Sequence, residues 1–173
     1  MKVIQQNAIS VDGYIAGPNH DISWTSIESW EDFINLTNET GNLVLGRVTY
    51  GLMQSAGELE HFKKIQVVAL TTNDQLVEKK DNIIVTNKSP KETLKLLKEK
   101  GHKKVLIGGG GRLNASFLEA GLIDEIYLNV HPLVLTQGTP LYTVYKNNKL
   151  DLKLLNTKKL STQVTQFHYK VIK

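Results

Sequence analysis

The glycine run Gly108 to Gly111 is the part of this sequence whose composition points most directly to a ligand. It follows the apolar segment 104–107, which reads as a buried strand, and precedes 112–120, where the apolar spacing predicts a helix. Glycines tolerate positive φ and let a ligand approach the backbone closely. The helix behind them directs free N–H groups and its positive dipole end at the same place. The pattern predicts a seat for a diphosphate; the alternative is a tight turn that binds nothing.

The run matches neither of two common nucleotide-binding motifs. Counted from Gly109, the sixth position is Asn114 rather than glycine, and Asp124 and Glu125 already begin the next strand, so the G-x-G-x-x-G pattern fails. No Gly-Lys-Ser/Thr follows, so it is not a Walker A loop. We therefore expect a cofactor site of a different type.

A second strand-to-helix turn contains Gly46, Arg47 and Thr49. Glycine opens the turn, the guanidinium of Arg47 offers a fork of donors, and Thr49 adds a hydroxyl near a helix start. Alone this is a weak signal, but with the glycine run it predicts two anion-binding turns for one ligand with several phosphates. Thr71 and Thr72, at the end of another apolar segment, either hold a phosphate or cap a loop.

We expect strands that alternate with helices to position these turns. Strands are expected at 3–9, 43–45, 65–70, 82–86, 104–107, 124–135, 152–155 and 164–171. Helices are expected from a capping box at Thr25 and Glu28 to about residue 38, from 46 onward, from Ser89 to about 100, and at 112–120. Ile27 and Trp30 are predicted on the inward face of the first helix, and Tyr127, Asn129 and His131 on a partly open strand face.

Buried central strands separated by helices predict an α/β fold of three α/β/α layers around a twisted, mostly parallel sheet. The last two strands adjoin without a helix, which predicts an antiparallel edge. We find no repeat or linker, so residues 1–173 are expected to form a single domain.

Composition narrows the class of protein. The chain has 173 residues, 40% of them apolar, and no cysteine, which excludes disulfides and thiolate metal sites. We expect a cytoplasmic protein with no membrane segment and no metal, because no apolar stretch is long enough and no His/Asp/Glu cluster has ligand spacing. The net charge of +4 is spread over lysines interleaved with acids, which favours a solvated surface over nucleic-acid binding.

Several motifs in series carry a resemblance to a known family. They are Ala8-Ile-Ser-Val-Asp-Gly-Tyr-Ile-Ala-Gly17, Leu45-Gly-Arg-Val-Thr-Tyr50, Ile107-Gly-Gly-Gly110, Gly121-Leu-Ile-Asp-Glu125 and His131-Pro-Leu-Val-Leu135. In this order, over essentially the whole chain, they resemble the dihydrofolate reductase-like superfamily. Within it the chain is most similar to the C-terminal reductase domain of the riboflavin-biosynthesis deaminase-reductase and its stand-alone bacterial relatives.

The resemblance implies an NADPH that lies across the strand ends, and a homodimer. It implies that Ala8 and Ile15 cover the nicotinamide and that Gly108, Gly109, Gly110 and Gly111 take the diphosphate. It further implies that the remaining phosphate contacts, including those to the 2′-phosphate, come from Gly46, Arg47, Thr49, Thr71 and Thr72.

Two departures from the family pattern bear on the substrate. Riboflavin-pathway reductases typically have a lysine at the position of Gln6 and an acid at that of Ile107, and both help to handle the phosphorylated pyrimidine. The deaminase domain is absent from this chain, and Thr136-Gln137 replaces a usual glycine.

The catalytic candidate is Asp12, at the end of the first strand, where substrate should meet the nicotinamide. A turn role is favoured for it, because Asp-Gly is a common turn pair. Asp32 is a substrate-binding candidate, because a carboxylate on this helix binds the pterin in dihydrofolate reductases; the alternative is a solvated helix residue. Trp24 and Phe33 either floor the substrate pocket or belong to the core, and His131 is expected to be structural.

The sequence thus predicts an NADPH-dependent reductase of a small heterocyclic or imine-type substrate, pterin- or pyrimidine-like. Two alternatives remain open. One is the riboflavin-pathway 5-amino-6-(5-phosphoribosylamino)uracil reductase, and the other is an NADPH-sensing protein without turnover.

Overall fold

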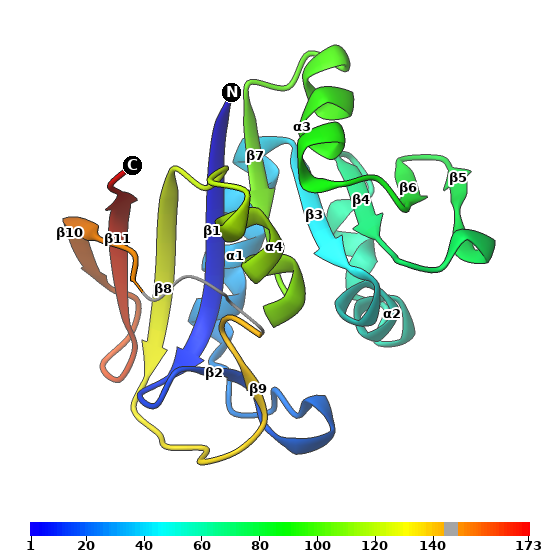
Figure 1. The fold of residues 1–173 in the computed structure, drawn as a ribbon. Coiled ribbons are helices and arrows are strands. Elements are labelled where there is room, and N and C mark those ends of the chain that lie inside the picture. The colour runs from blue at the N-terminus through cyan, green and yellow to red at the C-terminus, as the bar shows by residue number, and fades with distance from the viewer. Residues whose placement is uncertain (144–148) are drawn as a thin grey trace.

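The computed structural model describes residues 1–143 and 149–173, which build one large sheet with helices on both faces (Figure 1). The helices are α1 (Ile27–Thr40), α2 (Arg47–Ser55), α3 (Pro90–Glu99) and α4 (Gly111–Glu119), with single-turn helices η1 (Pro18–His20), η2 (Glu58–Phe62) and η3 (Asp74–Leu76). The strands are β1 (Lys2–Ser10), β2 (Tyr14–Ala16), β3 (Asn42–Gly46), β4 (Gln66–Leu70), β5 (Glu78–Lys80), β6 (Ile83–Thr86), β7 (Lys104–Ile107), β8 (Glu125–His131), β9 (Thr139–Pro140), β10 (Leu152–Lys159) and β11 (Thr165–Val171).

The nine-stranded sheet has the order β10-β11-β8-β1-β7-β3-β4-β6-β5. Its central strands, from β8 to β6, run parallel to one another, whereas β10 and β11 form an antiparallel edge. The predicted mostly parallel sheet with an antiparallel edge is therefore confirmed. The short strand β5 adds an antiparallel strand at the opposite edge that the sequence did not indicate, since Glu78–Lys80 has no apolar pattern.

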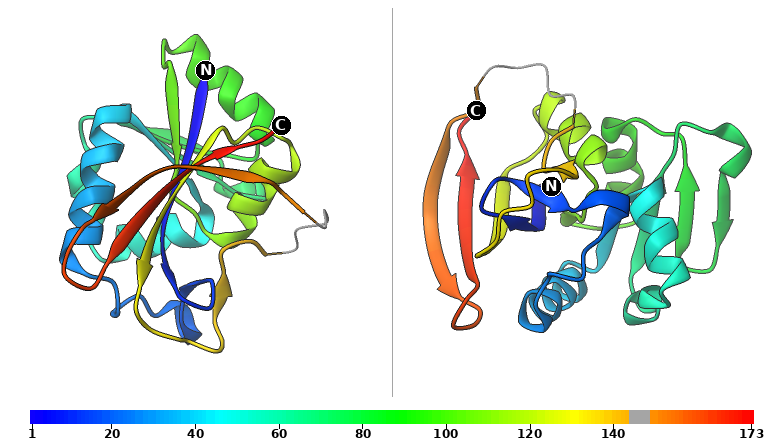
Figure 2. Two further views of the ribbon diagram at one scale, coloured as in Figure 1. Left: turned by 90° about the vertical axis from the view of Figure 1, so that its left-hand side faces the viewer. Right: turned by 90° about the horizontal axis from the view of Figure 1, so that it is seen from below.

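Helices cover both faces of the sheet (Figure 2), and each face carries a separate apolar core. On one face α3 and α4 pack through Leu97 and Phe117 against alternate strand residues such as Val44 and Val105. On the other face α1 and α2 contribute Phe33 and Met53, which pack with the strand residues whose side chains point to that face. The central strands are apolar at both sets of alternate positions, because helices cover both faces of the sheet. This is the expected three-layer α/β/α arrangement.

The start of α1 differs from the prediction by one residue. Ser26, not Thr25, is the N-cap, and its hydroxyl oxygen accepts a hydrogen bond from the amide of Ser29. The Thr25 hydroxyl instead donates to the carbonyl of Ile22. The shift leaves Ile27 in the first turn with its side chain 74% exposed, so its predicted inward position is wrong.

The long strand predicted at 124–135 ends earlier, with β8 stopping at His131 before Pro132. Proline has no N–H to donate to a strand ladder. Asn129 and His131, expected on a partly open face, are buried beneath α1 and the segment that leads into it. Within the described part of the chain, no helix is both long and apolar enough to cross a membrane.

Candidate active site

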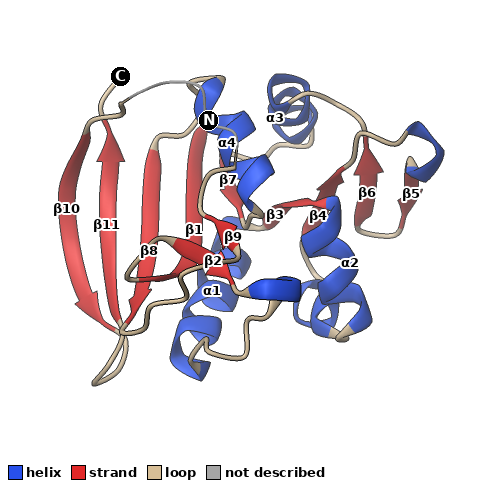
Figure 3. Cartoon of the chain, turned by 60° about the horizontal axis from the view of Figure 1, so that its bottom comes forward, coloured by secondary structure: helices blue, strands red, loops and turns tan. Residues whose placement is uncertain are grey.

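The central parallel strands end at one edge of the sheet (Figure 3), and residues at this edge line a cleft of about 960 Å³. Residues at the carboxyl ends of five neighbouring strands line it, namely Ala8, Gly108, Gly46, Leu70 and Asn87 for β1, β7, β3, β4 and β6. Ligands of open α/β sheets bind at this edge, because the loops and helix starts that follow the strands gather there.

The starts of α2 and α4 supply the cleft with free backbone N–H groups. Both helices have glycine N-caps, Gly46 and Gly110, and neither has a side-chain cap hydrogen bond. The helices α1 and α3, by contrast, are capped by Ser26 and Ser89. The first N–H groups of an uncapped helix need another acceptor, and an anion satisfies them. Of the four α-helices, the two without side-chain caps are thus the two that follow the predicted anion-binding turns.

The two turns are tied together by backbone hydrogen bonds. The amide of Gly46 donates to the carbonyl of Gly109 at 2.8 Å, and the amide of Gly108 donates to that of Val44 at 2.9 Å. A Cβ added at Gly110 would lie 3.3 Å from the Thr49 hydroxyl oxygen, in the space between the helix starts. The arrangement forms a single cradle with backbone N–H donors from both helix starts.

All but one of the residues predicted to bind the cofactor line the cleft. They are Ala8, Ile15, Gly46, Arg47, Thr49, Thr71, Thr72, Gly108, Gly110 and Gly111. The hydroxyl of Thr71 also accepts from the amide of Asn73 at 3.0 Å, so it caps its loop while facing the cleft. The two sequence interpretations of Thr71 are therefore compatible.

Gly109 is the exception, and the structure gives a different reason for its being glycine. It does not line the cleft; its φ is +97°, and an added Cβ would lie 2.9 Å from the side-chain nitrogen Nδ2 of Asn7. Gly111 likewise lacks room, because a Cβ there would meet the carbonyl oxygen of Pro140 in β9. Packing alone therefore requires glycine at positions 109 and 111, whether or not a ligand binds, whereas Gly110 faces the cleft.

Sequence reasoning missed two cationic side chains of the cleft, those of Lys88 and Arg112, and the imidazole of His20. Lys88 follows β6, and β6 lies next to β4, so Lys88 lines the same cleft as Thr72 and Arg47. A lysine just before a Ser-Pro helix start carries no signal by itself. Only the strand order shows that it shares a cleft with Arg47.

Asp12 does not line the cleft. Its carboxylate accepts hydrogen bonds from the amides of Leu135 and Thr136, at 3.1 and 2.8 Å, and from the Ser10 hydroxyl at 2.6 Å. The Ser10 hydrogen bond, followed by those of the two amides, holds the pKa of the Asp12 carboxyl below its usual value. This geometry matches the turn role and ties the loop after β8 to the end of β1.

The aromatic candidates divide between cleft and packing. Phe33 lines the cleft and stacks on Trp30, with ring centroids 5.5 Å apart. Trp24 does not line it; its ring meets the ring of His131 edge-on at 5.1 Å. The expectation that Trp24 contributes to the pocket therefore finds no contact to support it.

His131 is buried and holds the segment before α1. Its Nε2 accepts from the amide of Ser26 at 3.1 Å, so its Nδ1 carries the proton and donates to the carbonyl of Asn129 at 2.9 Å. Burial lowers the pKa of His131, which favours this neutral form. Its contacts are structural, as the sequence indicated.

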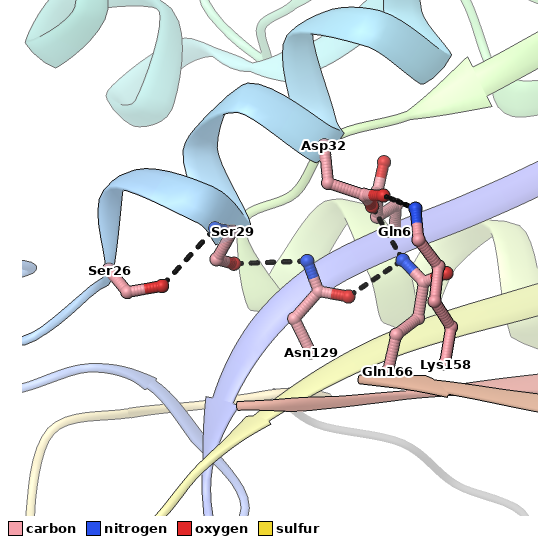
Figure 4. Close-up of polar contacts among 7 residues, drawn as sticks. All are labelled: Gln6, Ser26, Ser29, Asp32, Asn129, Lys158 and Gln166. Carbon is pink, nitrogen blue, oxygen red and sulfur yellow. Dashed lines mark hydrogen bonds and ion pairs between the residues drawn. The ribbon is translucent and has the colours of Figure 1, made fainter. Parts of the chain in front are cut away.

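Asp32 lies behind the cleft wall, in a separate hollow of about 460 Å³ that Lys158 and Gln166 also line. Its carboxylate accepts from the side-chain amides of Gln6 and Gln166 and pairs with the ammonium of Lys158 at 3.0 Å (Figure 4). Asp32 therefore reaches the cleft only through other side chains, through Gln6 directly and through Gln166 to Asn129. Direct contact with a substrate, as the sequence suggested, is not what this position offers.

The fold and the cleft define an α/β protein with a groove across the carboxyl ends of its parallel strands. The chain belongs to the RibD C-terminal domain family, whose model matches residues 1–166. It is 30% identical to the uncharacterized protein YyaP of Bacillus subtilis strain 168, over 97% of this chain and 94% of that protein.

Solved structures share the fold. A proposed riboflavin biosynthesis protein from Shewanella sp. PV-4 superposes with a TM-score of 0.85 at 24% identity, over 100% of both chains. RibD of Acinetobacter baumannii superposes with a TM-score of 0.76 at 20% identity, covering 99% of this chain and 58% of that one. The predicted family and the predicted dihydrofolate reductase-like fold are thus confirmed.

Proposed function

We propose that this protein is an NADPH-dependent reductase of a small heterocyclic or imine-type substrate, pterin- or pyrimidine-like. The observation that carries the proposal is the cradle between the starts of α2 and α4, where two helices without caps direct their free N–H groups into one cleft. Membership of the RibD C-terminal domain family, which includes reductases, supports it.

The cradle fits the phosphates of a dinucleotide. Backbone N–H groups at Arg47 and Gly111 and the Thr49 hydroxyl are donors suited to a diphosphate, and Gly110 leaves the room that it needs. The side chain of Arg47 at the start of α2 and that of Lys88 after β6, two strands farther along the sheet, are the cations that suit a 2′-phosphate. The residues present therefore fit NADPH better than NADH.

The other end of the cleft, beside β1 and α1, suits a flat ring. Phe33 and Trp30 offer an aromatic wall, and Ile22 faces the same cleft. NADPH, when bound, supplies the hydride; the chain's own residues orient the ring and exclude water from it. Ala8 and Ile15 line the cleft between the cradle and this end, where the nicotinamide would lie.

Two alternatives share the cofactor site. A riboflavin-pathway reductase of 5-amino-6-(5-phosphoribosylamino)uracil is disfavoured, because Gln6 replaces a cation and Ile107 is fully buried in the core. An NADPH-sensing protein without turnover is favoured by one feature: among the described residues that line the cleft there is no aspartate or glutamate to serve as an acid.

The test is a titration of NADPH followed by its fluorescence, and then a substrate panel monitored at the absorbance band of the reduced nicotinamide. The reductase proposal expects NADPH to bind and at least one pterin, pyrimidine or cyclic imine to be reduced. NADPH binding with no oxidation by any compound would favour the sensor, and no NADPH binding would defeat both.

A homodimer is also proposed, through β10 at the sheet edge. All eight residues of β10 are exposed, among them Leu152, Leu154 and Leu155. An exposed edge strand with apolar side chains is a ready surface for pairing with a second copy. Light scattering should give twice the chain mass, and Leu154→Lys should shift it toward the monomer; a monomeric wild type would contradict the proposal.

A further inference from the structure

The floor of the cleft beside α1 consists of neutral polar side chains that are almost completely buried. Gln6 of β1, Ser29 of α1 and Asn129 of β8 line the cleft and are 1%, 3% and 1% exposed. The lysines and arginines among the described lining residues are Arg47, Lys88 and Arg112, which follow β3, β6 and β7 rather than β1. This floor therefore offers hydrogen bonds but no positive charge.

The direction of every hydrogen bond in this floor is set by Asp32. A carboxylate only accepts, so Gln6 and Gln166 must both direct Nε2 at it, at 2.7 and 2.5 Å (Figure 4). The second N–H of Gln166 donates to Oδ1 of Asn129 at 2.9 Å. Asn129 must then direct Nδ2 at the hydroxyl oxygen of Ser29, at 3.0 Å.

Because these directions are fixed, one hydrogen-bond acceptor and one donor of the floor have no partner among the described residues. Oε1 of Gln6 is buried and has no hydrogen-bond donor among the described residues. The Ser29 hydroxyl oxygen accepts from Asn129, and within the described chain no acceptor takes its proton. A buried acceptor left unpaired destabilises the protein, because it has lost its hydrogen bonds to water and gained none in return. Because Gln6 lines the cleft, a ligand that brings an N–H recovers this cost.

We propose, resting on the reductase function above, that Gln6 and Ser29 determine specificity for an uncharged, unphosphorylated heterocycle. The ring presents an N–H to Oε1 of Gln6 and a carbonyl or ring nitrogen to the Ser29 hydroxyl. Asp32 is a positioning residue: it never touches the ring but holds Gln6 with its acceptor free. The absence of a lysine or arginine from the described floor leaves a phosphate on this ring without a partner.

The experiment uses a matched ligand pair, 5-amino-6-ribosylaminouracil and its 5′-phosphate, measured by calorimetry with and without NADP⁺. The unphosphorylated compound should bind at least as tightly as the phosphate. Gln6→Met, which keeps the volume and removes the acceptor, should weaken its binding about tenfold, while the Kd for NADPH stays unchanged.

Asp32→Asn supplies the second variant. A carboxamide at this position donates as well as accepts, so Gln6 can turn its oxygen toward helix α1 and its nitrogen toward the cleft. We expect about a tenfold loss of ring affinity, again at constant NADPH affinity. Glu31→Gln, which removes the neighbouring exposed carboxylate of the same helix, is the control and should leave both affinities unchanged.

Several outcomes would overturn the inference: tighter binding of the 5′-phosphate by tenfold or more, no binding of the unphosphorylated ring, or unchanged ring affinity in both variants. A failure of the reductase proposal looks different, because it appears as absent NADPH binding in the wild type. The ring titration without NADP⁺ decides the specificity question independently of that result.

Discussion

The backbone amide of Gly46 donates a hydrogen bond of 2.8 Å to the carbonyl of Gly109, which joins the start of α2 to the turn before α4. These residues are far apart in the chain, but they follow β3 and β7, which are neighbours in the sheet. The bond places two helix starts without side-chain caps side by side. The proposed cofactor site depends on this juxtaposition.

Gly110→Ala tests the cradle with the smallest possible change. The φ of Gly110 is −82°, so alanine is not strained there, but its methyl group would lie 3.3 Å from the Thr49 hydroxyl oxygen and enter the cradle. We expect NADPH affinity to fall at least about tenfold with little change in melting temperature.

The control for that variant is Gly51→Ala. Gly51 lies within α2, and an added Cβ meets nothing within 4 Å. Replacing a helical glycine should stabilise the protein by about 0.5–1 kcal/mol and leave NADPH binding intact. Equal NADPH affinity in the Gly110→Ala and Gly51→Ala variants would show that NADPH does not bind in the cradle.

Arg47→Ala should discriminate between the two nicotinamide cofactors. Loss of a charged hydrogen bond to the 2′-phosphate is expected to weaken NADPH binding about 10- to 100-fold and NADH binding much less. Lys88→Ala should act in the same direction, since Lys88 lines the same cleft. Equal losses for the two cofactors would refute the assignment of Arg47 to the 2′-phosphate; Lys91→Ala, at an exposed position of α3, is the control.

Asp12→Ala should separate an anchoring role from catalysis. Its carboxylate holds the amides of Leu135 and Thr136, so the variant should melt at a lower temperature while NADPH binding and turnover per folded molecule persist. The lowered pKa of Asp12 means that its contribution to stability is present above the usual carboxyl pKa and is lost as the pH falls through the lowered one. A large loss of turnover at unchanged melting temperature would instead make Asp12 catalytic.

His131 should make stability depend on pH below neutrality. Burial lowers its pKa from the ordinary value of 6.5. Between the two pKa values the imidazole is therefore protonated in the unfolded chain and neutral in the folded chain. Stability is therefore full above about pH 6.5 and declines as the pH falls from there toward the lowered pKa of the folded state. His131→Gln should be less stable at pH 7.5 and should lose less on going to pH 5.5; parallel urea-unfolding curves for both proteins at the two pH values would contradict this.

The sequence was sufficient for the features that depend on local chemistry. Gly46 and Gly110 each follow an apolar run and precede a helical pattern, so both strand-to-helix turns could be predicted without a sheet order. The layers followed from strands that are apolar on both phases. The start of α1 was misplaced by one residue because Thr25 and Ser26 are both good caps, and only the hydrogen bond from Ser29 distinguishes them.

Features that depend on distant pairs could not be predicted. Lys88 shares a cleft with Arg47 only because β6 lies beside β4, and no local sequence pattern predicts this order of strands in the sheet. Asp32 looked like a substrate ligand or a solvated helix residue. Its actual partners, Gln6, Lys158 and Gln166, come from three different strands, up to 134 positions away in the chain.

The most direct test of the central claim is a crystal structure of the protein with NADPH. The account predicts the diphosphate between the starts of α2 and α4, within hydrogen-bond reach of the backbone N–H groups of Arg47 and Gly111 and of the Thr49 hydroxyl. Well-ordered NADPH bound elsewhere, or an empty cradle at saturating NADPH, would contradict it.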